Sequence, residues 1–290
     1  MTTARQRSWR VAVGPAEDRG VTKLAAWEGL RTTFKYSADA DTRPNNLEIS
    51  LYNLNDRSRA YLDSDADAPL LVLLYAGFGD EPPLRAVADI VDVEHKRDGV
   101  DRVTTIRAGE GERAYTDAHV SLSFRPGAKL SDIVGAIGAS YDGVGIDFDR
   151  SQLLALPEVV RERGLSFNGR ASAALSMLAP ELAISPTVQA GSLVFLPREP
   201  ETGPQSLVLT AETGLLGYPT REKKKRRGAS GRWVISALLD YPIQPGAVVV
   251  VGSEELNGGV VVDEMTITGD SHGDEWAAEL TVTPIEVESK

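Results

Sequence analysis

The sequence predicts a mainly β protein in which two antiparallel β-barrel or sandwich domains flank a small α+β insert. Apolar residues alternate with polar ones in short runs at both ends of the chain, which is typical of half-buried strands. Turn-forming residues separate these runs, and near residue 126 the apolar spacing becomes helical. The expected boundaries are 1–125 for the first β-domain, 126–204 for the insert with its linker, and 205–290 for the second β-domain.

The first β-domain begins with expected strands at 4–13 and 30–36, followed by an alternating strand at 47–52. In that strand Leu47, Ile49 and Leu51 are expected to face the core, with Tyr52 near a turn. Asn55 is a suitable N-cap for a short helix that runs to Tyr61. The apolar run Leu70–Tyr75 then predicts a strand buried on both faces.

A hairpin is expected next, with strands at 86–95 and 102–108. Asp98-Gly99 predicts its turn, because both residues tolerate a positive φ. Val120, Leu122 and Phe124 alternate with serines and predict one further strand of this domain.

The insert is expected to hold two helices and a hairpin. Leu130, Ile133, Val134 and Ile137 keep helical spacing, with Ser131 or a neighbour as the cap. A second helix is expected over 170–178, with Pro180 and Ser185-Pro186 as its stop, and then a hairpin that turns at 189–191.

The last domain contains expected strands at 206–210, 232–238 and 247–252 and a final hairpin of 259–268 with 275–285. A loop between the first two strands carries the one sharp charge feature, five consecutive basic residues: Lys223, Lys224, Lys225, Arg226 and Arg227. Such a run is typical of a solvated loop. It is also a candidate assembly contact loop, an arm that meets an acidic partner surface or a polyanion.

The composition excludes several classes of protein. The 290 residues carry a net charge of −11, and duplex-binding proteins usually show a basic footprint instead. There are no cysteines, so disulfides and thiolate zinc sites are excluded. The apolar runs are too short for a membrane span, and the N-terminus shows no signal peptide. We therefore expect a protein that folds in a cytoplasm and does not insert into a membrane.

The sequence shows no legible catalytic residues, metal ligands or cofactor motif, and we expect no enzyme activity. Asp270, His272 and Asp274 could chelate a cation, but between two strands they are typical turn residues. The aspartates of "YDGVGIDFDRS" lack the ladder and the closing glutamate of a calcium loop. No phosphate-binding or nucleophile-elbow motif occurs.

Several stretches, in their order along the chain, resemble one family. They are "NNLEISLYNLNDRSRAYL", "LVLLYAGF", the hairpin around Asp98-Gly99, "LSFNGRASAALSMLAPELAISPTVQAGSLVFLPR", "TAETGLLGYPT" and the ending from "YPIQPG" to "TVTP". Together they resemble the baseplate hub proteins of bacteriophage tails, and the resemblance covers nearly the whole chain.

The resemblance implies two tube-like β-domains per chain and a homotrimer whose six such domains match the sixfold tail tube above and the threefold spike below. The implied partners are other copies of this chain, the tail tube protein, the spike protein and other baseplate proteins. The implied location is the tail baseplate of the virion, after assembly in the host bacterial cytoplasm. Genomic DNA would pass through the channel without specific binding, and an acidic wall would favour that passage.

Three alternatives stay open. The chain could be the hub of a phage-derived injection machine such as a tailocin, or a hub with cell-wall hydrolase activity. A free-standing carbohydrate-binding protein is the third, and it predicts a monomer.

Overall fold

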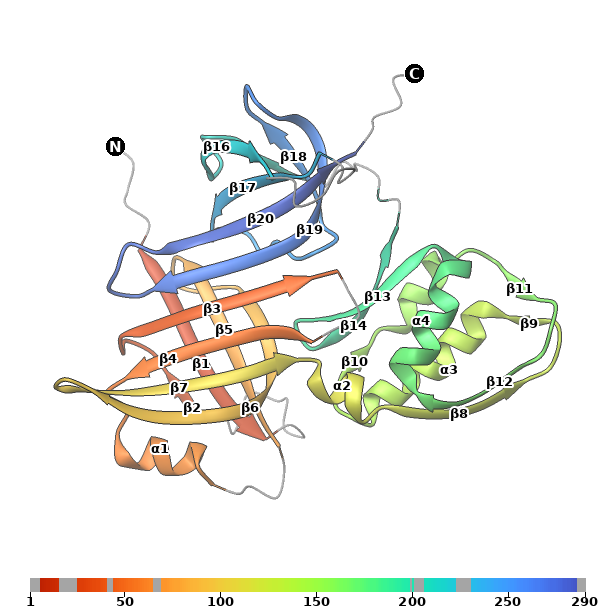
Figure 1. Cartoon of the computed structure of the whole chain (residues 1–290), viewed down its shortest axis with the longest axis horizontal. Helices are drawn as coiled ribbons and strands as arrows, with labels where there is room; N and C mark the ends of the chain where they lie inside the picture. Colours follow the sequence, from red (N-terminus) through yellow and green to blue (C-terminus); the bar gives the residue numbers. More distant parts are fainter. Residues whose placement is uncertain are drawn as a thin grey trace.

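A computed structural model describes residues 6–15, 25–40, 44–64, 69–198, 200, 206–222 and 231–285. One large sheet dominates it, with the strand order β16-β17-β20-β19-β3-β4-β7-β6-β5-β1-β2 and with β18 and β15 attached beside β19 (Figure 1). All of its pairs are antiparallel except β15 with β18. The prediction of a mainly β protein is confirmed. The strands of this sheet form one continuous series, the other described strands form three small sheets, and no closed barrel is found among them.

The N-terminal half of the sheet closely follows the predicted strands. Its elements are β1 (Arg7–Pro15), β2 (Ala25–Trp27), β3 (Thr32–Asp39), β4 (Asn45–Tyr52), α1 (Asp56–Leu62), β5 (Leu70–Phe78), β6 (Leu84–Asp98) and β7 (Asp101–Glu110). Leu47, Ile49 and Leu51 are fully buried, as their spacing predicted. The Asn55 side chain accepts a hydrogen bond of 2.8 Å from the backbone N–H of Ser58, which confirms the N-cap.

The hairpin between β6 and β7 is confirmed, but its predicted turn is wrong by one residue. Asp98 pairs with Asp101, so Gly99 and Val100 form the two-residue turn. Gly99 has a φ of +60°, whereas Val100 is not among the residues with positive φ. Only the first central residue therefore needs the left-handed region, and glycine occupies it.

We expect Gly99→Ala to lower the free energy of unfolding by about 1 kcal/mol, because an L side chain at this φ is strained. Asp98→Ala, one residue earlier in a strand position, serves as the control and should cost clearly less. Urea unfolding followed by circular dichroism measures both values. An equal loss for the two variants would contradict the observed register.

The insert lies beside the sheet and has its own core. Its elements are α2 (Glu112–Thr116), β8 (His119–Phe124), β9 (Ala128–Lys129), α3 (Leu130–Asp142), β10 (Asp147–Phe148), η1 (Arg150–Ala155), β11 (Val160–Arg161), β12 (Leu165–Arg170), α4 (Ala171–Leu182), β13 (Ile184–Gln189) and β14 (Ser192–Pro197). The hairpin of β13 and β14 turns at Ala190 and Gly191, as predicted. Residues of α3 and α4 form most of this second core.

Strand β8 was expected in the first β-domain, but it pairs with β12 of the insert. Its residue Val120 packs in the core of the insert, together with Ala114 of α2. The domain boundary at residue 125 stays a prediction. The strand pairing and the packing place residues 112–124 with the insert.

The predicted start of α3 and the predicted end of α4 both differ from the structure. Ser131 lies inside α3 and does not cap it, because the helix starts where the Leu130 N–H donates to the Val159 carbonyl. Pro180 does not stop α4, which continues to Leu182. Pro180 has no N–H to donate to the Ser176 carbonyl, so the last turn loses one helix hydrogen bond. The burial of Leu178 and Leu182 keeps that turn on the core despite this cost.

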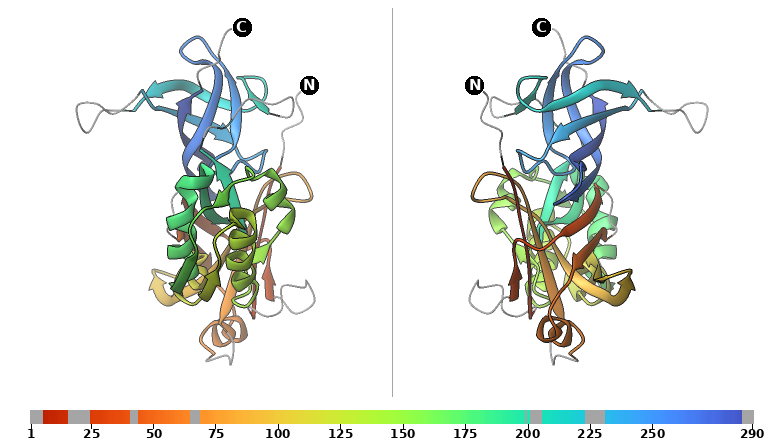
Figure 2. Two further views of the ribbon diagram at one scale, coloured as in Figure 1. Left: turned by 90° about the vertical axis from the view of Figure 1, so that its right-hand side faces the viewer. Right: turned by 90° about the vertical axis from the view of Figure 1, so that its left-hand side faces the viewer.

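The C-terminal half contains β15 (Leu207–Leu209), β16 (Leu215–Arg221), β17 (Trp233–Leu238), β18 (Val248–Gly252), β19 (Asn257–Asp270) and β20 (Trp276–Pro284). Strand β16 was not predicted. Both halves share a single hydrophobic core that runs from Val11 to Val282. In both views of Figure 2 the C-terminal strands lie at one end of the molecule and α1 at the other.

Candidate assembly site

Strand β19 joins the two halves of the sheet edge to edge. Its first part pairs with β18, and its second part, from Glu264 to Asp270, pairs with β3. The register of β19 against β20 shifts between Val262 and Glu264, which is where the strand changes partner. A bulge bends a strand and increases its twist. This irregularity therefore lets one strand serve both halves.

The exposed face of this junction is polar across five neighbouring strands. The hydroxyls of Ser37 and Thr266 lie 3.2 Å apart across β3 and β19. Cross-strand partners then carry charges of alternating sign, in the order Lys35, Glu48, Arg107 and Asp92. The two halves thus present one continuous polar surface.

Arg107 is the best-paired cation on that face. Its guanidinium lies 2.7 Å from Asp92 and 3.4 Å from both Glu48 and Glu94. The hydrogen bond to Asp92, followed by the one to Glu94, raises the pKa of Arg107. Its positive charge is therefore largely matched by neighbouring carboxylates.

A buried arginine clamps the C-terminal half against the N-terminal strands. Arg85 is 1% exposed, and its Nε donates to the carbonyl of Ala76 at 2.7 Å. Its two terminal nitrogens donate to the carbonyls of Leu239 at 2.6 Å and Tyr241 at 2.5 Å. Burial lowers the pKa of Arg85 to about 10, so the group stays charged near neutral pH.

A buried carboxylate attaches the insert to the sheet. Glu110 accepts hydrogen bonds from the Tyr36 hydroxyl at 2.5 Å, the Asn45 amide at 2.8 Å and the backbone N–H of Val87 at 3.2 Å. The backbone N–H of Ala190, in the turn of the insert hairpin, donates to the same carboxyl group. Burial raises the pKa of Glu110 despite these bonds, which act in the opposite direction.

Strand β16 forms one open edge of the described sheet. It pairs with β17 only near its two ends, and the register shifts between Leu216 and Thr220. Tyr218, in the middle of this irregular stretch, is 78% exposed. An edge with unpaired backbone groups and an exposed aromatic side chain is available for pairing with another chain.

The predicted contact loop, Lys223–Arg227, lies outside the described residues. The structure does fix its two attachment points, because the Glu222 N–H donates to the Arg232 carbonyl at 3.0 Å. These residues lie at the ends of β16 and β17, next to the open edge of the sheet. The role of the loop stays a prediction.

The described residues contain no group of three or more side chains suited to hold a metal ion. Asp270, His272 and Asp274 lie in the turn between β19 and β20, where the Asp270 carboxylate accepts the His272 N–H at 2.9 Å. The interpretation of this motif as a turn is confirmed. Over the same part of the chain, no helix is long and apolar enough to cross a membrane.

Comparison with known proteins gives a clear result at the level of structure only. No protein-family model matches the chain, and no curated protein matches its sequence. The 43 kDa tail protein of prophage MuSo2 from Shewanella oneidensis superposes with a TM-score of 0.62 at 11% identity, covering 96% of this chain and 99% of that one.

Two further similar structures are a secretion-system component and a chain of a protein complex. A type VI secretion component of E. coli, which resembles the T4 bacteriophage tail proteins gp27 and gp5, has a TM-score of 0.53 at 11% identity and covers 94% of this chain and 77% of that one. A chain of the Francisella PdpA–VgrG complex has a TM-score of 0.59 at 8% identity and covers 98% of this chain and 60% of that one. The chain thus shares its fold with a phage tail protein and a type VI secretion component.

Sequence reasoning missed the buried charges of Arg85 and Glu110. Glu110 follows Thr104, Ile106 and Ala108 at a spacing of two, so the alternation places its carboxylate on the inward face of β7. That signal was present in the sequence. For Arg85 only a charged residue within an apolar strand was visible, and its carbonyl partners at Leu239 and Tyr241 are more than 150 residues away.

Proposed function

We propose that the protein is a structural baseplate hub of a phage tail and acts as a homotrimer between the sixfold tail tube and the threefold spike. The observation that carries this proposal is the edge-to-edge junction of β3 and β19, which joins two β-halves into one continuous sheet. Three copies with two halves each supply six sheet segments around an axis. The likeness to a phage tail protein along the full length of both chains supports the same assignment.

The open edge at β16 supports the trimer. An unpaired edge strand is a liability in a free monomer, and closed rings remove it by pairing with the next subunit. Tyr218 and the attachment points of Lys223–Arg227 lie at this edge. This edge is where we place the contact between copies, and the basic run is an assembly arm beside it.

The polar face across β6, β7, β4, β3 and β19 is the channel wall in this proposal. Its hydroxyls and paired charges offer few free cations to a phosphate backbone, since Arg107 is matched by three carboxylates. Unmatched lysines and arginines are what give proteins salt-dependent affinity for DNA. Genomic DNA therefore passes without being held.

The tail tube protein, the spike protein and other baseplate proteins are the partners in this proposal, and the virion tail baseplate is the location, reached after assembly in the bacterial cytoplasm. The Francisella structure contains a chain of this fold within a PdpA–VgrG complex, which supports a spike-type partner. The likeness to a type VI secretion component keeps the hub of a phage-derived injection machine as the second candidate.

The similar tail proteins support a function without catalysis. A peptidoglycan zymogram tests this part of the proposal, since lysis would favour a hub with hydrolase activity.

Cryo-electron microscopy of the assembled tail tests the proposal directly. We expect threefold symmetry in the layer that contains this protein, with β16 of one copy against its neighbour. Strict sixfold symmetry in that layer would reject the hub and indicate a tube component. A monomer in every preparation would favour the free-standing binding protein.

We expect the triple variant Glu48→Lys, Glu264→Lys, Glu279→Lys to slow DNA ejection from assembled particles. The exposed face of the junction becomes more positive by six charge units per copy and attracts the DNA phosphates. The delay should shrink as salt rises, since screening shortens electrostatic attraction to about 10 Å at 0.1 M. A fluorescence ejection assay on purified particles measures it. The control exchanges Asp142, Glu162 and Glu212 for lysine away from this face, and an equal delay there would contradict the channel assignment.

A further inference from the structure

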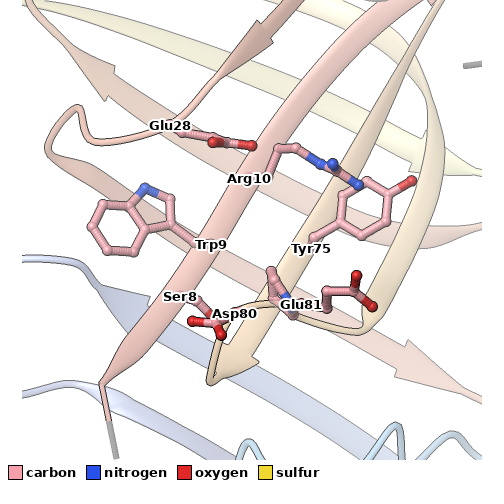
Figure 3. Close-up of a pocket in the computed structure, with 8 residues that line it drawn as sticks. Ser8, Trp9, Arg10, Glu28, Tyr75, Asp80 and Glu81 are labelled. Carbon is pink, nitrogen blue, oxygen red and sulfur yellow. The ribbon is translucent and has the colours of Figure 1, made fainter.

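A pocket of about 450 Å³ lies along β1, beside the loop that connects β5 to β6. Trp9 and Tyr75 provide its aromatic walls, and the carboxylates of Glu28, Asp80 and Glu81 surround it (Figure 3). None of these residues belongs to the junction, to the open edge or to the polar face described above. The pocket therefore has no role in the assembly as proposed so far.

The pocket has an excess of negative charge. No ion pair to Glu28, Asp80 or Glu81 occurs within the described part of the chain, and all three residues are exposed. The single cation at the pocket, Arg10, lies with its guanidinium 4.1 Å from the centroid of the Tyr75 ring. Three carboxylates against one guanidinium leave the site suited to a positively charged ligand.

Two donors at the pocket lack partners. Ser8 Oγ and Trp9 Nε1 are inaccessible to solvent, and neither has a hydrogen-bond partner in the structure. Buried polar groups are normally paired, because an unsatisfied donor costs about 1–3 kcal/mol. Because solvent does not reach either atom, a ligand in the pocket does not pair with them in this conformation, and they do not select its chemistry. The three carboxylates beside Trp9 and Tyr75 are what fit a basic peptide segment, since cationic side chains pair with carboxylates and stack on aromatic rings.

The chain itself contains such a segment, the run Lys223–Arg227. Eight residues, 223–230, lie between Glu222 and Gly231, so their midpoint reaches at most about 14 Å from these attachment points. The pocket lies beyond the other end of β17, because Leu238 pairs with Ala277 and the adjacent Trp276 contacts Trp9 with ring centroids 6.2 Å apart. The seven residues from Arg232 to Leu238 make six steps and span roughly 20 Å. The segment is thus too short for the pocket of its own chain.

We propose that the pocket at Trp9 and Tyr75 of one copy receives the Lys223–Arg227 segment of a neighbouring copy. This inference rests on the proposed homotrimer and adds to it a specific lock between subunits. The open edge at β16 brings the neighbouring chains together, and the basic segment then fixes their order around the ring. The acidic pocket provides the complementary surface that the basic run requires.

A peptide-binding measurement tests the pocket. The receptor is the full chain with all five basic residues changed to alanine, so that no arm competes, and the probe is a fluorescent peptide of residues 219–232. We expect the triple variant Glu28→Gln, Asp80→Asn, Glu81→Gln to weaken peptide binding by roughly tenfold. This is the combined binding free energy of the three exposed charge pairs that it removes. The matched control is Asp142→Asn, Glu162→Gln, Glu212→Gln, which removes the same charge from other exposed positions. No binding, or an equal loss in the control, would overturn the pocket.

Carbodiimide cross-linking tests the arrangement between copies. Assemblies of mixed labelled and unlabelled chains should yield amide links from Lys223–Lys225 to Glu28, Asp80 or Glu81, in which the two peptides carry different isotopes. Links within one copy only, or none at these carboxylates, would overturn the inference. The symmetry of the layer is measured separately. Threefold symmetry without pocket-dependent binding rejects the pocket and keeps the hub, whereas pocket-dependent binding in a sixfold layer rejects the hub.

Discussion

Arg85→Met should lower the free energy of unfolding by about 3–5 kcal/mol, because it removes one partner of a buried charged contact. The guanidinium is buried and donates to three backbone carbonyls, of Ala76, Leu239 and Tyr241. Methionine fills much of the space but donates nothing, so three carbonyls lose a charged partner. Two of the three belong to the C-terminal half, and the contact between the halves loosens with them.

Arg107→Met is the matched control. It also removes an arginine with three contacts, but these contacts lie on the surface of the protein. Arg107 reaches three carboxylates, but its side chain is 44% exposed. Exposed ion pairs of that kind contribute little to the free energy of unfolding, because water and salt screen them. Urea unfolding of the two variants gives the comparison. A loss below about 1 kcal/mol for Arg85→Met would mean that water replaces the guanidinium and that the clamp is not needed.

Glu110→Ala should cost nearly as much, about 3–5 kcal/mol, because it leaves buried donors without an acceptor. The donors come from Tyr36, Asn45 and Val87 of the sheet and from Ala190 of the insert. Hydrogen exchange should therefore rise first in β13 and β14, where the insert loses its attachment. Glu279→Ala, at an exposed position, is the control and should cost less than about 0.5 kcal/mol. Unchanged exchange in the hairpin would contradict the role of Glu110 as the attachment.

Glu110 also predicts a dependence of stability on pH. Burial raises its folded pKa above the ordinary value of 4.5, so the folded chain holds this proton more tightly than the unfolded chain. Its contribution is fully present below pH 4.5 and decreases as the pH rises toward the raised folded pKa. Glu110→Gln cannot titrate. The difference in unfolding free energy between the wild type and this variant should fall as the pH rises above 4.5, and a rising difference would show that the hydrogen bonds outweigh burial.

Most strands of the two halves, though not β16, could be predicted because their signals are local. Alternation placed Leu47, Ile49 and Leu51 inward, and the hydrogen-bonding side chain of Asn55 marked the start of α1. The turn position could not be read from the sequence, because Asp98-Gly99 and Gly99-Val100 are both compatible with the residues and only the cross-strand register distinguishes them. Pro180 shows the opposite case, in which burial of the last turn of α4 outweighs a local helix-breaking signal.

The sequence by itself determined the mainly β class, the helical insert, the acidic balance and one basic run, because period, charge and turn chemistry are properties of neighbouring residues. Only the tertiary structure decided that β19 joins both halves into one sheet, that β8 belongs with β12, and that Arg85 and Glu110 hold the parts together. These contacts connect residues that lie far apart in the chain. Whether a buried charge is stabilised depends on partners that only folding brings within hydrogen-bond distance.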